Sequence, residues 1–275
     1  MKYLFILFFA FSSFGFAQDF SVMTYNVKLD YPKEYENSWT NRKSFFINQL
    51  KFYEPDVLGV QEALPNQMKD IDSLMPSYHF VGVGRDNGKD EGEYSAIFYK
   101  TDKFKIIKSN TFWLSETPDK VSMGWDAVCN RVCTYALFQH KTTKEYFWVF
   151  NTHFDHIGKV ARKNSATLII NKIKELNQEN YPVILTGDFN MESDHESITY
   201  IKENLEDSKE KAKLTFGPEG TYNGFHFDRP VTRRIDYIFI SKLDVKKYTV
   251  LSDNWDLKYP SDHLPVFVKF KLVKN

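Results

Sequence analysis

The segment VILTGDFN, residues 183–190, places an acid and an amide directly after an apolar run that ends on a glycine. Burying Asp188 and Asn190 there costs several kcal/mol unless each side chain finds hydrogen-bond partners. A turn explains the pattern, because Gly, Asp and Asn are common turn formers. A reaction centre explains it as well, because ligand sites of α/β proteins lie at the carboxyl edge of the sheet.

Polar side chains follow other apolar runs in the same way. NTHFDH, residues 151–156, comes after bulky apolar residues, and strand alternation places Asn151, His153 and Asp155 on one face. Asp236 interrupts the apolar segment IDYIFI, where an unpaired carboxylate is costly. One such ending is a weak signal, but the repetition predicts that these side chains gather at one sheet edge.

Asp262 and His263 lie between two prolines in YPSDHLPV. Neighbours in a regular strand face opposite ways, but a loop at this position lets both side chains enter one pocket. The second proline favours extended geometry for the residue before it. We therefore add both residues to the candidate site.

Two further residues offer oxygen ligands. Glu62 follows the apolar run DVLGV, where it either caps the next helix, whose first turn favours negative charge, or binds a divalent cation. Asn26, near the end of the first apolar segment, is by itself more typical of a structural amide. Together with Asp262, these oxygens suit a hard ion such as Mg²⁺, with Mn²⁺ as a substitute.

Several other chemistries have no motif in this chain. The sequence contains no nucleophile elbow, no cysteine with an attendant histidine, no HExxH and no paired CxxC. A serine or cysteine nucleophile and a tight zinc site are therefore not indicated. Acids, amides and histidines around a hard cation favour the hydrolysis of phosphate esters.

The elements that must position these residues belong to a mixed α/β domain. Strand-like runs cover 20–27, 56–60, 79–83, 95–99, 132–138, 146–152, 182–187, 235–240 and 265–270. Helix-like runs cover about 40–53, about 64–75 and 158–180. This mixture predicts an α/β fold with four layers, in which two stacked mixed β-sheets are flanked by helices.

The chain has 275 residues, 42% of them hydrophobic, so we expect one domain over residues 18–275. Residues 1–17, MKYLFILFFAFSSFGFA, have the layout of a secretory signal peptide that is cleaved before Gln18. The apolar run is shorter than the ~20 residues of a membrane anchor. We therefore expect an exported monomer, periplasmic or extracellular, without a stable membrane anchor.

Basic and acidic residues are balanced, with 36 Lys and Arg against 36 Asp and Glu. Proteins that grip duplex nucleic acid through many phosphates carry a marked positive excess, so the balance argues against that mode of binding. Cys129 and Cys133 are expected to be free buried thiols, because in a strand they lie about 13 Å apart. A turn at Asn130 and Arg131 is the alternative that brings them together.

At these residues the chain resembles the endonuclease/exonuclease/phosphatase superfamily, which has the deoxyribonuclease-I-like fold. The matching motifs are TYNV, GVQEA, NTHFDH, TGDFN, RIDYIF and SDHLPV, in the family's order and over nearly all of residues 18–275. GEYSAIFYK, FWLSETP and TYNGF further resemble a secreted bacterial branch, distantly similar to nocturnin and the deadenylase exonucleases. The resemblance implies two stacked mixed sheets flanked by helices, in agreement with the layers predicted above.

The resemblance also implies a metal site and a water-activating acid. Glu62 is similar to the principal Mg²⁺ ligand of the family, with Asn26 beside it and Asp262 able to contribute. Asp188 matches the aspartate that orients or deprotonates the attacking water. The family places an acidic residue after the YNV motif in some nucleases, and Asp30 is the candidate replacement here.

The remaining implied roles concern the phosphate group. Asn190 and His153 match donors that stabilise charge on the phosphoryl oxygens. His263 matches the histidine that contacts the scissile phosphate, and Asp236 matches the carboxylate that orients and charges it.

Three residues are weaker candidates for substrate binding. Tyr94 resembles the phosphate-contacting tyrosine of the family, and Arg131 is a candidate contact for substrate phosphates. His156 and the adjacent Asp155 either bind substrate or tie their loop to the helix near Gly158, and we favour the tie.

These features support three hypotheses. The first is an Mg²⁺-dependent phosphodiesterase that acts on nucleic acid, with single strands as a candidate substrate, as a 3′–5′ exonuclease or an endonuclease. The second is a phosphoesterase acting on a phospholipid head group, an inositol phosphate or a phosphorylated glycan, which export and the neutral charge favour. The third is a binding module without activity, and the complete set of acids and histidines speaks against it.

Overall fold

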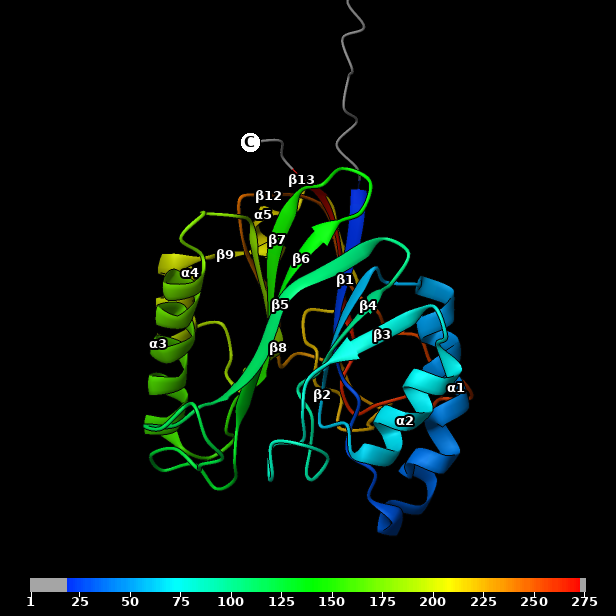
Figure 1. The fold of residues 1–275 in the computed structure, drawn as a ribbon. Coiled ribbons are helices and arrows are strands. Elements are labelled where there is room, and N and C mark those ends of the chain that lie inside the picture. Colours follow the sequence, from blue (N-terminus) through cyan, green and yellow to red (C-terminus); the bar gives the residue numbers. More distant parts are fainter. Residues whose placement is uncertain (1–18, 273–275) are drawn as a thin grey trace, which may run out of the picture.

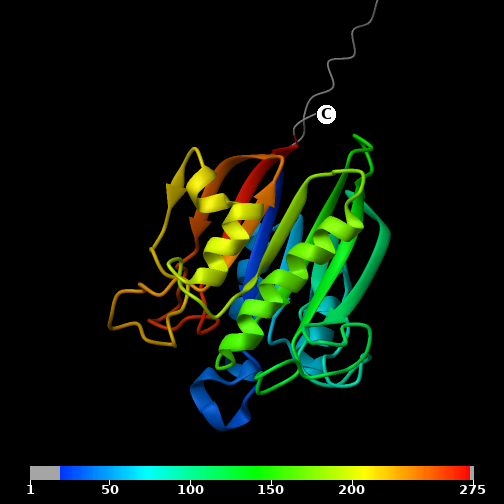
Figure 2. The same ribbon diagram turned by 90° about the vertical axis from the view of Figure 1, so that its left-hand side faces the viewer.

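A computed structural model describes residues 19–272 of the protein. Two β-sheets stack face to face, and helices cover their outer faces (Figure 1, Figure 2). The predicted four-layer α/β fold is therefore confirmed. The predicted signal peptide, residues 1–17, lies outside the described residues, so export stays a prediction.

The seven-stranded sheet contains β1 (Asp19–Asn26), β2 (Val57–Gln61), β3 (Tyr78–Val81), β4 (Ile97–Lys100), β10 (Thr215–Phe216), β12 (Leu243–Val250) and β13 (Val266–Leu272). The six-stranded sheet contains β5 (Phe104–Trp113), β6 (Val132–His140), β7 (Tyr146–His153), β8 (Val183–Asp188), β9 (Glu206–Asp207) and β11 (Asp236–Ser241). The helices are α1 (Trp39–Tyr53), α2 (Pro65–Leu74), α3 (Lys159–Leu176), α4 (Glu196–Asn204) and α5 (Ser208–Lys211), with a 3₁₀ turn at Pro32–Asn37. The strand orders are β10-β12-β13-β1-β2-β4-β3 and β5-β6-β7-β8-β11-β9.

Separate apolar cores hold the layers together. Phe138 and Ile184 belong to the core between the two sheets. Phe46 of α1 packs in the core on the outer face of the seven-stranded sheet. Ile169 of α3 and Ile198 of α4 pack on the outer face of the six-stranded sheet. The helical spacing of apolar residues in 158–180 thus reports a real buried stripe, although α3 ends at Leu176.

β5, β12 and α4, together with the short β9, β10 and α5, were not predicted from the sequence. β5 is an end strand of its sheet and exposes most of residues 105–110, so its apolar alternation is weak. β12 carries Lys246 and Lys247 and has only the two-residue β10 on its outer side. Lysines at sheet edges oppose pairing with other chains, and they also hide a strand from a search for apolar runs.

The strand register delivers the candidate residues to one edge. β1 and β2 run parallel with Asn26 opposite Gln61, and β7 and β8 run parallel with His153 opposite Asp188. β11 is antiparallel to β8, so its first residue, Asp236, also lies opposite Asp188. This edge is at the end of the molecule away from the C-terminus (Figure 1).

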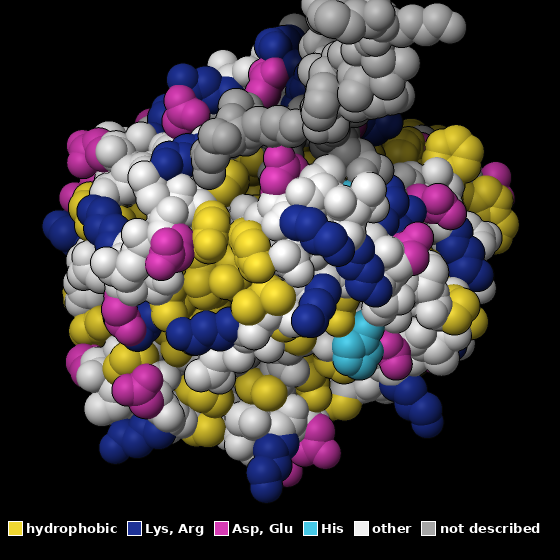
Figure 3. Space-filling model, turned by 45° about the horizontal axis from the view of Figure 1, so that its top comes forward, with side chains coloured by type: hydrophobic (Ala, Val, Ile, Leu, Met, Phe, Trp, Pro, Cys, Tyr) yellow, Lys and Arg dark blue, Asp and Glu magenta, His cyan; other side chains and the backbone are white. Residues whose placement is uncertain are grey.

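The surface carries charges of both signs. On the face shown in Figure 3, Lys and Arg are interspersed with Asp and Glu, as the balanced composition predicts. No helix within residues 19–272 is long and apolar enough to cross a bilayer.

A polar contact joins the two sheets beneath the candidate site. Asn151 of β7 is fully buried, and its Nδ2 donates to the carbonyls of Val60 and Ala96 in the other sheet at 2.8 and 2.9 Å. Its Oδ1 accepts from Gln61 Nε2 at 2.6 Å. Gly59 makes this approach possible, because a Cβ there lies 2.6 Å from Asn151 Oδ1. Asn151 therefore joins the sheets instead of serving the reaction.

We predict that Gly59→Ala lowers the free energy of unfolding by about 2–3 kcal/mol, because the added methyl group overpacks the contact between the sheets. Urea unfolding measures the change, with Ser252→Ala, at an exposed position, as the control. A variant as stable as the wild type contradicts the close approach at Gly59.

Candidate active site

A cavity of about 500 Å³ lies at the edge where β1, β2, β7 and β8 end. The predicted residues that line it are Glu62, Arg131, His153, His156, Asp188, Asn190, Asp262 and His263. Asn26 and Asp236 are buried behind this lining and bond to Glu62 and His263. The structure thus brings together every predicted site residue except Tyr94.

Asn26 holds two carboxylates side by side. Its Nδ2 donates to Glu62 Oε1 at 2.9 Å and to Asp188 Oδ2 at 3.0 Å, while its Oδ1 accepts from the backbone of Lys28. Asn26 therefore presents N–H groups to the centre, where the sequence analysis expected an oxygen ligand. Glu62 Oε2 also accepts from the backbone N–H of Leu29 at 3.0 Å. The alternative role of Glu62 as a helix cap is wrong, because one of its oxygens accepts from Asn26 at the end of β1 and the other from Leu29 just after it.

His263 lies between two aspartates. Its Nδ1 is 2.8 Å from Asp236 Oδ2, and its Nε2 is 3.7 Å from Asp188 Oδ2. Burial acts to lower the pKa of His263, but the two carboxylates raise it well above its usual value. Burial and Asp236 raise the pKa of Asp188 to about 7, although His263 opposes the shift. Thr221 fixes Asp236 by donating to its Oδ2 at 2.6 Å.

His153 and Asn190 face Asp188 from the other side. His153 Nε2 lies 3.1 Å from Asn190 Nδ2 and 3.5 Å from Asp188 Oδ2. Burial, with Arg131 and Arg85 nearby, lowers the pKa of His153 well below its usual value. The surroundings therefore disfavour a proton on His153 and favour one on His263.

The donor set fits a divalent cation. Glu62, Asp188 and His263 each offer a ligand atom, and these atoms lie within 4.8 Å of one another. Asp262 is buried on the same cavity wall, and burial, with Glu62 nearby, raises its pKa. Lys28 Nζ lies 3.7 Å from Asp262 Oδ2 and balances only part of this negative charge. Carboxylate oxygens without a thiolate are the ligands that hard ions prefer.

Tyr94 and Asp30 do not reach the cavity, contrary to the sequence analysis. The ring of Tyr94 packs in the core under α1 and α2, and its hydroxyl donates to the carbonyl of Lys89 at 3.1 Å. Asp30 accepts from the backbone of Trp39 at the start of α1 and from Asn66 at 2.8 Å. Both side chains therefore serve the fold.

Asp155 ties its loop to α3, as the sequence analysis favoured. Its Oδ1 accepts from the backbone N–H of Gly158 at 2.7 Å and of Ile157 at 2.9 Å, and its Oδ2 accepts from Val128 at 3.1 Å. His156, however, faces the cavity, where its Nδ1 lies 3.1 Å from Arg131 Nη2. Asp155 therefore has the structural role, whereas His156 lines the cavity.

The sequence analysis missed several residues of the lining. Lys28, Arg85, Glu93, Tyr222 and Arg233 all line the cavity. Lys28 directly follows the predicted strand over 20–27, whereas the other four lie in loops away from the polar strand ends. Glu93 directly precedes Tyr94 within GEYSAIFYK, so this motif was the signal that could have found it.

Both thiols are free in the structure, as predicted. Cys133 is buried in β6, as predicted. Cys129 was also predicted to be buried, but it is only partly buried and lines the cavity.

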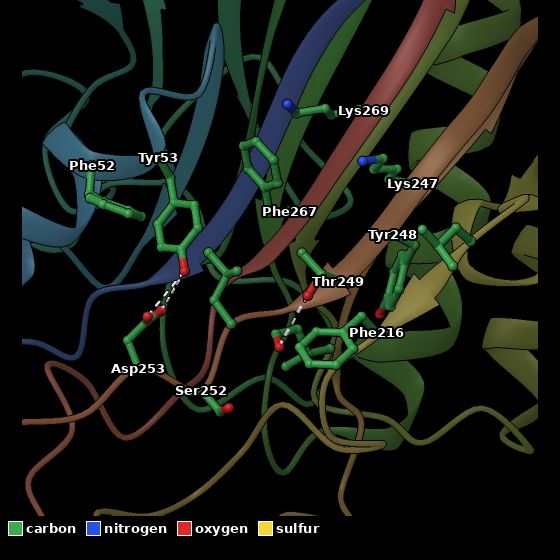
Figure 4. A pocket seen from close by; sticks show the side chains of 13 residues that line it. Phe52, Tyr53, Phe216, Lys247, Tyr248, Thr249, Ser252, Asp253, Phe267 and Lys269 are labelled. Carbon is green, nitrogen blue, oxygen red and sulfur yellow. Dashed lines mark hydrogen bonds between the residues drawn. The ribbon is translucent and has the colours of Figure 1, made fainter.

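A second cavity, of about 620 Å³, has a different character (Figure 4). Phe52, Phe216 and Phe267 line it, and its only described carboxylate, Asp253, bonds to Tyr53. No histidine stands among its described lining residues. The acids and histidines of the candidate active site therefore line the smaller cavity.

The endonuclease/exonuclease/phosphatase family model matches residues 23–263. A family protein from Bacteroides thetaiotaomicron has a similar structure, with a TM-score of 0.90 and 40% identity over 94% of this chain and 99% of that one. The mannosyl-6-phosphatase of Bacteroides thetaiotaomicron is 42% identical over 91% of this chain and 99% of that one, with a TM-score of 0.89. The protein therefore belongs to the endonuclease/exonuclease/phosphatase family.

More distant relatives include nucleases. The catalytic domain of human nocturnin shares the fold, with a TM-score of 0.72 and 20% identity over 93% of this chain and 95% of that one. The Saccharomyces cerevisiae 3′–5′-exoribonuclease subunit Ccr4 is 20% identical over 93% of this chain, which spans 39% of that protein's length. Family and site together make this protein a metal-dependent hydrolase of phosphate esters.

We predict that Asp155→Asn destabilises the protein by about 2 kcal/mol at pH 7. Burial acts to raise the pKa of Asp155, but the backbone N–H groups of Gly158, Ile157 and Val128 lower it to about 2. The contribution is fully present above pH 4 and is lost as the pH falls toward 2. Urea unfolding at pH 7, 5 and 3 measures the difference between variant and wild type, which should shrink at pH 3. Asp102→Asn, at an exposed position, is the control, and a gap that stays constant over this range contradicts the assignment.

Proposed function

We propose that the protein is an Mg²⁺-dependent phosphomonoesterase that acts on a phosphorylated sugar or glycan. The observation that carries this proposal is the cavity itself, which joins the acid and histidine centre to walls made of charged and hydrogen-bonding side chains. A polar alcohol esterified to phosphate suits such walls. The 42% identity to a mannosyl-6-phosphatase supports the same substrate class.

Glu62, whose carboxylate lies in the cluster with Asp188 and His263, would hold the ion, with Asp262 on the same cavity wall as a further oxygen ligand. When bound, Mg²⁺ supplies positive charge to the phosphoryl oxygens and to the leaving alkoxide. Asn26 keeps Glu62 beside Asp188 by donating to both. Glu62 would therefore hold the ion beside Asp188, the acid that accepts a proton from water.

Residues of the chain activate the water and stabilise the negative charge on the phosphoryl group. Asp188 accepts a proton from the attacking water, whose oxygen forms a bond to phosphorus while the bond from phosphorus to the sugar oxygen breaks. Cationic His263, held by Asp236, stabilises negative charge on the phosphoryl group. His153 and Asn190, which face Asp188 from the other side, are the remaining polar groups that can contact the phosphoryl oxygens. The leaving alkoxide takes a proton from solvent water, so the products are the free alcohol and inorganic phosphate.

A nuclease is the second candidate. The exoribonuclease subunit Ccr4 is a relative over most of this chain, and Arg233 on the cavity wall lies over the ring of Tyr222 at 5.4 Å. An arginine and an aromatic ring of this kind can stack on a base. The balanced charge favours the phosphomonoesterase over this alternative.

A substrate panel distinguishes the two candidates. We expect release of phosphate from mannose 6-phosphate and p-nitrophenyl phosphate, abolished by EDTA and restored by Mg²⁺. Single-stranded RNA, single-stranded DNA, inositol phosphates and bis-p-nitrophenyl phosphate complete the panel. Cleavage confined to RNA or DNA establishes the nuclease, and undiminished turnover in EDTA contradicts metal dependence.

We predict that Asp188→Ala and His263→Ala each lower kcat by about 10²–10³-fold or more, because each removes a group that acts on the reacting atoms. Both variants should keep a melting temperature near that of the wild type. Asp102→Ala, at an exposed position, is the matched control for Asp188→Ala and should keep full activity. Near-normal turnover of either site variant would show that its assigned role is wrong.

A further inference from the structure

One wall of the cavity is built from residues that the phosphoryl chemistry does not use. Arg85, Glu93, Arg131 and His156 form it, and we refer to these four residues as the polar wall. Arg85 Nη1 donates to Glu93 Oε2 at 2.7 Å, and Arg131 Nη2 lies 3.1 Å from His156 Nδ1. The wall therefore consists of two hydrogen-bonded pairs of donors and acceptors.

The polar wall has buried donors that the described residues leave unpaired. Arg131 is 5% exposed, and its Nη1 has no hydrogen-bond partner among residues 19–272. Arg85 Nε is likewise buried without one. An unpaired buried donor costs about 1–3 kcal/mol, more when it is charged, so such groups usually meet a ligand or water.

The wall starts beside the reaction centre. His153 Nδ1 lies 3.9 Å from Glu93 Oε2, while His153 Nε2 faces Asp188 at 3.5 Å. His153 Nδ1 is also buried without a hydrogen-bond partner. The alcohol part of a phosphate ester that extends past His153, away from Asp188, would therefore lie next to Glu93.

The charges of the wall select a neutral ligand. Arg85 is paired with Glu93 at 2.7 Å, and Arg131 lies 3.5 Å from Asp155 Oδ2, so each guanidinium has a carboxylate. A second phosphate would meet the carboxylate of Glu93 as well as the arginines. A hydroxyl group both donates and accepts, so adjacent hydroxyls match alternating guanidinium and carboxylate groups.

We propose that the polar wall binds the vicinal hydroxyls of the sugar that leaves the phosphate, with Glu93 as acceptor and Arg85 and Arg131 as donors. This inference rests on the proposed phosphomonoesterase activity. It assigns the phosphate to the side of the cavity with Asp188 and the sugar to the polar wall. Glu93 and the two arginines are specificity-determining residues in this view.

The test compares two phosphomonoesters that differ in the alcohol. Mannose 6-phosphate carries vicinal hydroxyls, whereas p-nitrophenyl phosphate has none. We expect Glu93→Gln to lower the ratio of kcat/KM for mannose 6-phosphate to that for p-nitrophenyl phosphate by about 10–100-fold, as for the loss of one or two charge-assisted hydrogen bonds. Glu203→Gln, at an exposed position, is the matched control and should leave the ratio unchanged.

Deoxy analogues of mannose 6-phosphate give a second measurement. Removing the hydroxyl that contacts Glu93 should lower kcat/KM in the wild type but not further in Glu93→Gln, so the two losses should not add. An unchanged ratio in Glu93→Gln, or losses that add fully for every deoxy analogue, overturns the inference. If Glu93→Gln fails to fold, Arg85→Gln is measured in its place, with the same outcomes.

Binding separates this inference from the proposed activity. Saturation-transfer NMR with methyl mannoside reports on the wall even if the wild type hydrolyses no phosphomonoester. Binding that Glu93→Gln weakens supports the wall although the proposed activity fails. No binding to the wild type, together with no hydrolysis of mannose 6-phosphate, overturns both.

Discussion

The close contact between the two sheets is the constraint on which the site depends. Asn151 reaches from β7 to backbone carbonyls of the other sheet, and Gly59 leaves the space for it. This contact sets the distance between β2 and β8, which carry Glu62 and Asp188 at their ends. Because Asn26 donates to both carboxylates, a small separation of the sheets would break the centre. A buried amide far from solvent therefore controls catalytic geometry.

The centre also concentrates negative charge that the chain balances only in part. The carboxyl groups of Glu62, Asp188, Asp236 and Asp262 converge on one buried imidazole, that of His263. Like charges in a buried site raise one another's pKa unless a cation is present. A metal-dependent enzyme uses this arrangement, because the bound ion turns a costly cluster into a defined site. The clustered carboxylates thus cost folding free energy, and the same cluster is what binds the ion.

The residues proposed to act on phosphate and those proposed to select the substrate come from different parts of the fold. The groups that act on phosphate come from strand ends, where the backbone is held by both sheets. The polar wall comes from connecting segments, with Arg85 and Glu93 between β3 and β4. Loops tolerate change better than strands, so one centre can be combined with different walls. The relatives of this chain include both a mannosyl-6-phosphatase and an exoribonuclease subunit.

The sequence by itself determined the residue types of the centre, the layered fold and the family, because buried strands leave apolar runs and their polar ends stand out against them. It did not reveal β5 or β12, whose edge positions admit lysines and polar residues. Nor did it separate the structural Tyr94 from its neighbour Glu93, which lines the cavity. Local patterns report whether a residue is buried. Only the tertiary structure decides which distant segment it meets.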